Sequence, residues 1–102
     1  SRILVSNLYM GRESRYNHAD KYFYGLKKIT IGKSLKDLSF LYRAKLDDVT
    51  EIRLLSRIPP LFKGFSNREF LNVTLIVPKG TIEDYKKHSV WSQFLTIKED
   101  IL

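Results

Sequence analysis

The chain of 102 residues contains no cysteine, which excludes a disulfide framework, a thiolate metal site and thiol catalysis. It also lacks any run of about 18 to 20 apolar residues, the length that a membrane-spanning helix requires. Its opening segment, residues 1–5, is too short and too polar at its flanks to serve as a signal peptide. We therefore expect no membrane span. With 43% apolar residues, one domain with a modest core is expected.

Acidic residues are scarce in the first half of the chain. Residues 1–46 hold ten lysines and arginines against three acidic residues, whereas residues 47–102 hold eight of each. The whole formal charge of +7 therefore arises in the first half. A basic surface indicates either an anionic partner or a well-solvated exterior, and the sequence leaves both open.

Pairs of aliphatic residues recur at a constant interval. Segments 29–31, 52–54 and 75–77 each carry two such residues separated by one other, and their starts are 23 positions apart (52 − 29 = 23; 75 − 52 = 23). Ile3 and Val5 offer an earlier copy, 26 positions before the first of these segments. Leucine-rich repeats have intervals of about 20 to 29 residues. Alternating aliphatic residues bounded by turn formers predict short strands with one buried face.

These strands are expected to form a parallel sheet, because too few residues separate them for a return strand. The chain would then coil, advancing about 4.8 Å per turn, with Ile29, Ile52 and Leu75 stacked in one inward row. Pro59-Pro60 forbids a regular helix or a central strand at that point. Apolar residues of the connections are expected to back the sheet: Leu35, Leu38, Phe40, Leu41, Leu46, Phe62, Phe65 and Phe70.

The period breaks after residue 77. Thr81 followed by Asp84 indicates a helix start, and bulky residues at near-helical spacing, Trp91 among them, predict a lid over the open apolar end and the unpaired strand edge. We expect one leucine-rich-repeat-like domain over residues 1–102, with a degenerate first coil (1–21), repeats (22–77) and a C-terminal helical cap (78–102). Nothing comparable shields the N-terminal coil, which is expected either to continue a longer array or to mediate self-association.

The stretch VTLIVPKGTIEDYKKHSVWSQFLTIKEDIL, residues 73–102, resembles the C-terminal end of BspA-like leucine-rich-repeat proteins. The residues that match are Val77, Pro78, Gly80, Tyr85, Trp91, Phe94, Ile97 and Glu99. FYG at 23–25 and the following LKKITIG resemble the internal repeat of the family, and IPP at 58–60 resembles its penultimate turn. The likeness covers about residues 22–102. Leu26 stands where the family commonly has cysteine, and residues 6–21 match the repeat poorly.

This resemblance implies a right-handed solenoid of short parallel strands with irregular or short helical connections. It also implies a secreted or cell-surface protein, frequently from host-associated bacteria and sometimes from parasitic protists. The implied role is adhesion or partner recognition through the sheet of the repeats.

Patterns for catalysis and metal binding are not evident. Gly32-Lys33-Ser34 is similar to the end of a phosphate-binding P-loop, but Lys27 stands where the first glycine is required. His18 and His88 are the only histidines, and neither has zinc-ligand spacing. The adjacent carboxylates of Asp47 and Asp48 are explained by turn formation rather than by a catalytic acid pair. We expect no enzymatic activity, no metal and no cofactor.

The candidate binding residues alternate with the buried aliphatic pairs and are therefore expected to point outward. They are Lys28, Thr30, Glu51, Arg53, Thr74 and Ile76. In register, Lys28 would lie beside Glu51, and Thr30 beside Arg53. Solenoids usually bind through such a face, so the first hypothesis is recognition of a protein or a glycan. Alternatively, Lys28 and Glu51 form only a weak exposed ion pair contributing about 0 to 1 kcal/mol.

A hypothesis of another class is binding of a polyanion, such as nucleic acid or a heparin-like chain, by the basic half. The basic residues concerned are Arg2, Arg12, Arg15, Lys21, Lys27, Lys28, Lys33, Lys36, Arg43 and Lys45. Aromatic residues interleaved with this charge could stack on bases or sugars: Tyr9, Tyr16, Tyr22, Phe23 and Tyr24. Affinity that falls steeply with salt would favour this alternative.

Overall fold

The computed structural model describes residues 2–4, 7–10, 22–24, 27–33, 38, 41 and 46–100. Seven strands, two α-helices and one 3₁₀ helix lie within these residues. In chain order they are β1 (Arg2–Leu4), β2 (Asn7–Met10), β3 (Tyr22–Tyr24), β4 (Lys28–Ile31), β5 (Glu51–Leu54), α1 (Asn67–Asn72), β6 (Thr74–Val77), α2 (Ile82–Lys87), η2 (Trp91–Gln93) and β7 (Thr96–Glu99).

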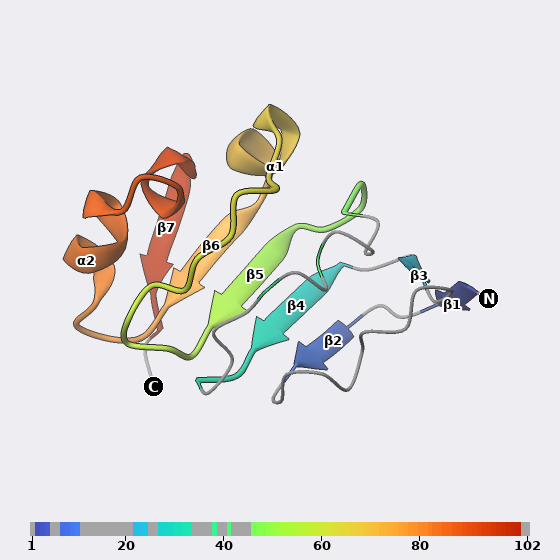
Figure 1. Ribbon diagram of the computed structural model, residues 1–102, viewed down its shortest axis with the longest axis horizontal. Coiled ribbons are helices and arrows are strands. Elements are labelled where there is room, and N and C mark those ends of the chain that lie inside the picture. The colour runs from blue at the N-terminus through green and yellow to red at the C-terminus, as the bar shows by residue number, and fades with distance from the viewer. Residues whose placement is uncertain are drawn as a thin grey trace.

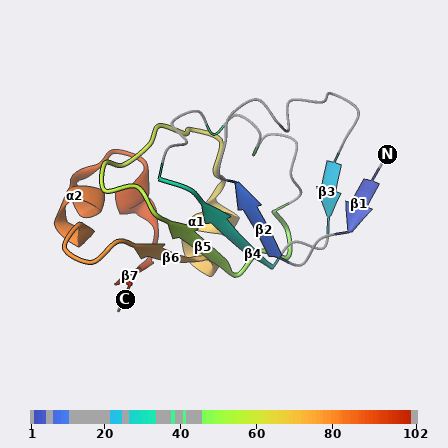
Figure 2. The same cartoon turned by 90° about the horizontal axis from the view of Figure 1, so that it is seen from below.

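The main sheet contains five parallel strands in the order β2-β4-β5-β6-β7 (Figure 1). Each strand of this sheet lies beside the one that precedes it in chain order, so each connection brings the chain back to start the next strand alongside the last. Strands β1 and β3 pair separately, also in parallel, and Figure 2 shows them set apart from the main sheet. The first and last strands lie at opposite ends of the molecule (Figure 1).

The register of the sheet places residues 23 positions apart against each other. Ile29 lies opposite Ile52, and Ile52 lies opposite Leu75, so the predicted pairing of these residues is confirmed. All three side chains are fully buried. The second aliphatic residue of each strand is buried as well: Ile31, Leu54 and Val77. Because side chains alternate along a strand, this register puts both aliphatic rows on one face and builds the core there.

The earlier copy of the repeat lies elsewhere than predicted. Leu8, and not Ile3, lies opposite Ile29, at a displacement of 21 positions (29 − 8 = 21). Ile3 pairs with Phe23 in the small sheet, and Val5 is outside the described residues. The prediction was wrong because residues 3–5 and 8–10 carry the same alternation, and pattern alone does not choose between them.

The connections supply the opposite wall of the core. Leu38, Leu41 and Phe62 are buried, as predicted. Leu46, Phe65 and Phe70 are partly buried against the same cluster. Leu35 and Phe40, predicted to share this role, lie outside the described residues.

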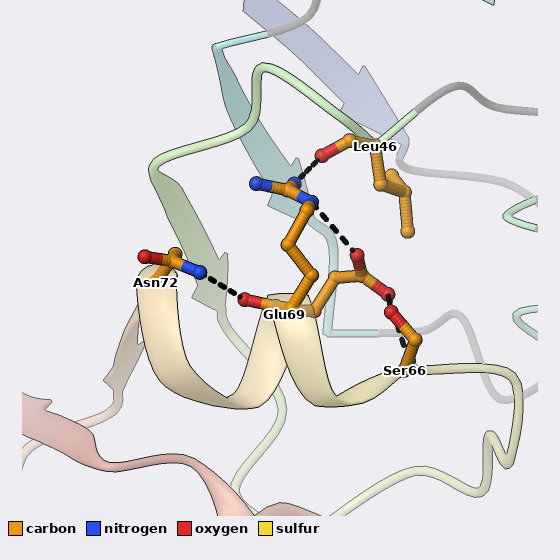
Figure 3. Close-up of polar contacts among 5 residues, drawn as sticks. Leu46, Ser66, Glu69 and Asn72 are labelled. Atoms are coloured by element: carbon orange, nitrogen blue, oxygen red, sulfur yellow. Dashed lines mark hydrogen bonds and ion pairs between the residues drawn. The ribbon is translucent and has the colours of Figure 1, made fainter.

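Helix α1, which was not predicted, begins after Ser66. The Glu69 carboxylate accepts hydrogen bonds from the amide of Ser66 at 2.8 Å and from its hydroxyl at 2.9 Å (Figure 3). The first of these bonds satisfies the backbone N–H of Ser66, a donor at the start of the helix. A serine followed three residues later by glutamate is a known signature of a helix N-terminus, so the sequence did carry the signal.

Arg68 of α1 ties this helix to the preceding connection. Its Nη2 donates to the carbonyl of Leu46, just before β5, and its Nε lies 3.3 Å from Oε2 of Glu69 (Figure 3). At the end of the helix, the side-chain Nδ2 of Asn72 donates a hydrogen bond to the carbonyl of Arg68 at 2.8 Å. Since α1 leads into β6, these contacts couple two successive turns of the chain.

The cap differs from the expected C-terminal helical segment. Helices α2 and η2 lie between β6 and β7, and the last described element is a strand. Ile97 of β7 lies opposite Leu75, 22 positions later (97 − 75 = 22). The interval therefore continues for one more strand, but Glu99 follows where earlier strands have a second aliphatic residue.

The hydrogen bonds of Glu99 explain why a polar residue stands at that position. Its Oε2 accepts hydrogen bonds from the amides of Gly80, at 3.0 Å, and Ile82, at 3.2 Å, at the start of α2. Thr81 is the N-cap residue, as predicted, but its hydroxyl donates to the carbonyl of Pro78. The carboxylate that serves the helix start thus comes from β7. Gly80 has a φ of 88°, a left-handed conformation that glycine adopts without strain.

Trp91 is fully buried, as expected of a residue that plugs the end of the core. Its indole Nε1 donates to the carbonyl of Pro60 at 2.7 Å. Its ring lies 5.4 Å from that of Phe65 and 5.9 Å from that of Phe94. The Pro59-Pro60 segment therefore supplies a rigid acceptor for the cap.

Tyr85 of α2 is buried, and its hydroxyl donates to the carbonyl of Ser56 at 2.7 Å. Burial raises the pKa of the phenol well above its ordinary value of about 10. A raised folded-state pKa means that stability is fully present below about pH 10 and is lost as the pH rises further, because the unfolded chain ionises first.

We therefore expect Tyr85→Phe to lose about 0.5 to 1.5 kcal/mol of unfolding free energy at pH 7, where it lacks the hydrogen bond. At pH 11 the difference should shrink or reverse, because phenylalanine does not ionise. Urea denaturation of both proteins at the two pH values measures this. An unchanged difference would contradict the burial of a neutral phenol.

Candidate functional site: the outward face of the main sheet

The outward face of β4, β5 and β6 carries the six residues predicted as a site. Lys28, Glu51 and Thr74 lie opposite one another along one row. A second row consists of Thr30, Arg53 and Ile76. Lys28 is exposed and the other five are half-buried. The structure therefore brings all six together, because their inward neighbours are fixed in the core.

Arg53 lies at the centre of this face. Its Nη1 contacts Oδ2 of Asp100, which follows β7, and its Nη2 lies 3.9 Å from Oε2 of Glu51. Because Asp100 is 47 residues away and β6 lies between, the arginine reaches across that strand. Glu51 therefore pairs with Arg53 of its own strand, and no ion pair joins it to Lys28 although both residues are described. The alternative of a Lys28–Glu51 pair was wrong.

The face also extends over β7, which the sequence reasoning missed. Thr96 lies opposite Thr74, and Lys98 lies opposite Ile76. Thr96 is half-buried and Lys98 is exposed. The signal was Ile97 at the expected interval, but it stands within a segment that was interpreted as helical cap.

At its other end the sheet continues into β2. Asn7 lies opposite Lys28, and Tyr9 lies opposite Thr30. These positions were also missed, since the earlier copy of the repeat was placed at Ile3. By backbone register, β2 thus continues the main sheet beside β4.

The residues of the polyanion hypothesis are only partly described. Lys27, Lys28 and Lys33 are exposed. Arg2, Tyr9, Tyr22, Phe23 and Tyr24 lie on strands β1 to β3. The others lie outside the described residues: Arg12, Arg15, Tyr16, Lys21, Lys36, Arg43 and Lys45.

The remaining motifs have structural surroundings. Gly32 is buried at the end of β4, with Lys33 exposed in the following turn. His88 accepts a hydrogen bond at Nδ1 from the amide of Val90 at 3.1 Å, while His18 lies outside the described residues. Within the described residues, no three histidine or carboxylate side chains gather so as to hold a metal ion.

None of the helices in the described part of the chain has the length and apolar character needed to cross a bilayer. No protein-family model, no curated protein and no solved structure matches the chain.

Proposed function

We propose that the chain is the C-terminal part of a BspA-like leucine-rich-repeat solenoid and works as a non-enzymatic binding module. The observation that carries this proposal is the parallel register of residues 23 positions apart, with both aliphatic rows buried. Stacked turns of this kind produce such a register, since each turn covers only its neighbours. The capping elements α2 and η2 at one end of the sheet also fit a terminal repeat (Figure 1).

The recognition surface in this proposal is the outward face centred on Arg53. Four of the six outward residues, Thr30, Arg53, Thr74 and Ile76, have a buried residue directly before and after them in the chain, as Arg53 has in Ile52 and Leu54. A face held in this way loses little conformational freedom on binding, which favours recognition of a large partner. The proposed role is adhesion to a protein at the cell surface or in the extracellular space.

Replacing Lys28 and Arg53 together with alanine tests this role. The immobilised chain is exposed to purified extracellular-matrix proteins, and capture is measured by surface plasmon resonance. We expect at least about a tenfold loss of affinity in the double variant, because two charged contacts near the centre of the face are removed.

The matched control replaces Arg57 and Lys79, which are exposed in connections outside the sheet, and removes the same charge. Thermal unfolding confirms that both variants fold. Equal capture by the double variant and the parent chain would contradict the assignment of the face.

Polyanion binding remains the alternative, favoured by the exposed ammonium groups of Lys27, Lys28 and Lys33. Titration with a heparin fragment at increasing salt distinguishes the two. A steep linear fall of log affinity with log salt, insensitive to Arg53, would favour the alternative.

A further inference from the structure

The guanidinium of Arg53 is already engaged by carboxylates of its own chain. It contacts Asp100 and lies 3.9 Å from Glu51. The arginine side chain keeps 31% of its surface exposed and that of Asp100 keeps 18%, so the pair lies at the surface rather than in the core. Because solvent still reaches both side chains of this partly buried pair, a competing carboxylate can approach the guanidinium and replace Asp100.

The charges on this part of the face are unbalanced. In the outward rows of β4 to β7, together with Asp100, three basic residues (Lys28, Arg53 and Lys98) stand against two acidic ones, and both of these acidic side chains lie against Arg53. The remaining carboxylate of these strands, Glu99, belongs to the inward row opposite Val77. Lys28 and Lys98 are exposed. The face therefore carries a net positive charge and offers ammonium groups on strands either side of the arginine, which favours an anionic partner.

The uncharged residues of the same face decide which anionic partner fits. On β4 to β7 they are Thr30, Thr74, Ile76 and Thr96, and none of these four is aromatic. The neighbouring strand β2 has Tyr9 opposite Thr30. Bases and sugar rings are usually held by stacking on aromatic side chains, so β4 to β7 are poorly suited to them. Threonine hydroxyls beside an aliphatic side chain suit a peptide, which presents both hydrogen-bonding and apolar groups.

We propose that the face binds an extended acidic peptide segment of a partner protein, with one of its carboxylates replacing Asp100 on the Arg53 guanidinium. Arginine binds planar carboxylates through its fork of N–H donors. Asp100 then acts as an internal competitor that keeps the unoccupied face paired. This inference rests on the proposed binding role of the face and names the chemistry of its ligand.

Asp100→Asn tests the competition directly. The probe is a fluorescent synthetic peptide of alternating glutamate and serine, and its affinity is measured by fluorescence anisotropy. We expect about threefold tighter binding, since the neutral amide competes weakly for the guanidinium. Asp84→Asn, on the exposed side of α2, removes the same charge. It should leave the peptide affinity equal to that of the parent chain within experimental error.

Arg53→Gln completes the test, and we expect it to weaken peptide binding by about tenfold. Equal affinities of the Asp100→Asn and Asp84→Asn variants would overturn the competition. A heparin fragment or single-stranded oligonucleotide of equal charge that binds through Arg53 while the peptide does not would overturn the peptide assignment. If matrix-protein capture still depends on Lys28 and Arg53 in either case, only this inference fails and the proposed binding role stands.

Discussion

Replacing Trp91 with alanine is expected to lower the free energy of unfolding by about 3 to 5 kcal/mol. The indole is fully buried, and its removal leaves a cavity bordered by the rings of Phe65 and Phe94. The carbonyl of Pro60 would also lose its donor. Because the rings belong to the cap and to the preceding connection, the substitution should loosen both at once. Chemical denaturation followed by circular dichroism measures the loss.

Two variants bracket this result. Leu95→Ala, four residues on and 73% exposed, should change stability by less than about 0.5 kcal/mol. Trp91→Phe keeps a ring but lacks the donor to Pro60, and we expect an intermediate loss. A Trp91→Ala protein as stable as the Leu95→Ala protein would refute the plugging role of the indole.

Replacing Ile52 with alanine is expected to cost about 2 to 5 kcal/mol. Ile52 is fully buried in β5 and lies between Ile29 and Leu75, so the cavity opens in the middle of the inward row. The loss should be transmitted to both neighbouring strands, because stacked turns share each interface. Denaturation midpoints, together with amide hydrogen exchange of β4 and β6, report both effects.

Leu71→Ala is the matched control for this substitution. Leu71 is also aliphatic but is 63% exposed on α1, and its truncation should stay within about 0.5 kcal/mol. Faster exchange confined to β5 after Ile52→Ala would contradict the shared interfaces, even if the overall loss were as large as expected.

Local alternation and equal spacing made the central strands predictable. In a strand, the residues on either side of a buried one must face outward, so the burial of Ile52 in its row also places Glu51 and Arg53 on the other face. The six residues of the candidate site followed from this rule without knowledge of any contact. The same rule was ambiguous near the N-terminus, where Ile3 and Leu8 begin equivalent patterns.

Contacts between distant residues could not be predicted in this way. Glu99 looks misplaced in an inward row until its bonds to the amides of Gly80 and Ile82, 19 and 17 residues earlier, are known. The pair of Arg53 with Asp100 spans 47 residues and depends on a long side chain crossing β6. Such pairs reflect side-chain reach in three dimensions, about which periodicity carries no information.

Helix α1 represents a third case, in which a local signal was present but weak. Its six residues are too few for a helical period to appear against the background of the sequence. Ser66 and Glu69 carried the only clear signature of its start. The capping pair therefore predicts such a short helix better than its apolar residues do.

Cross-strand nuclear Overhauser effects between backbone protons test the stacking of turns most directly. The account predicts contacts that join Ile29 with Ile52 and Ile52 with Leu75, in the evenly slanted pattern of parallel strands. Contacts in an antiparallel pattern, or their absence between these strands, would contradict the 23-residue turn and the binding face built on it.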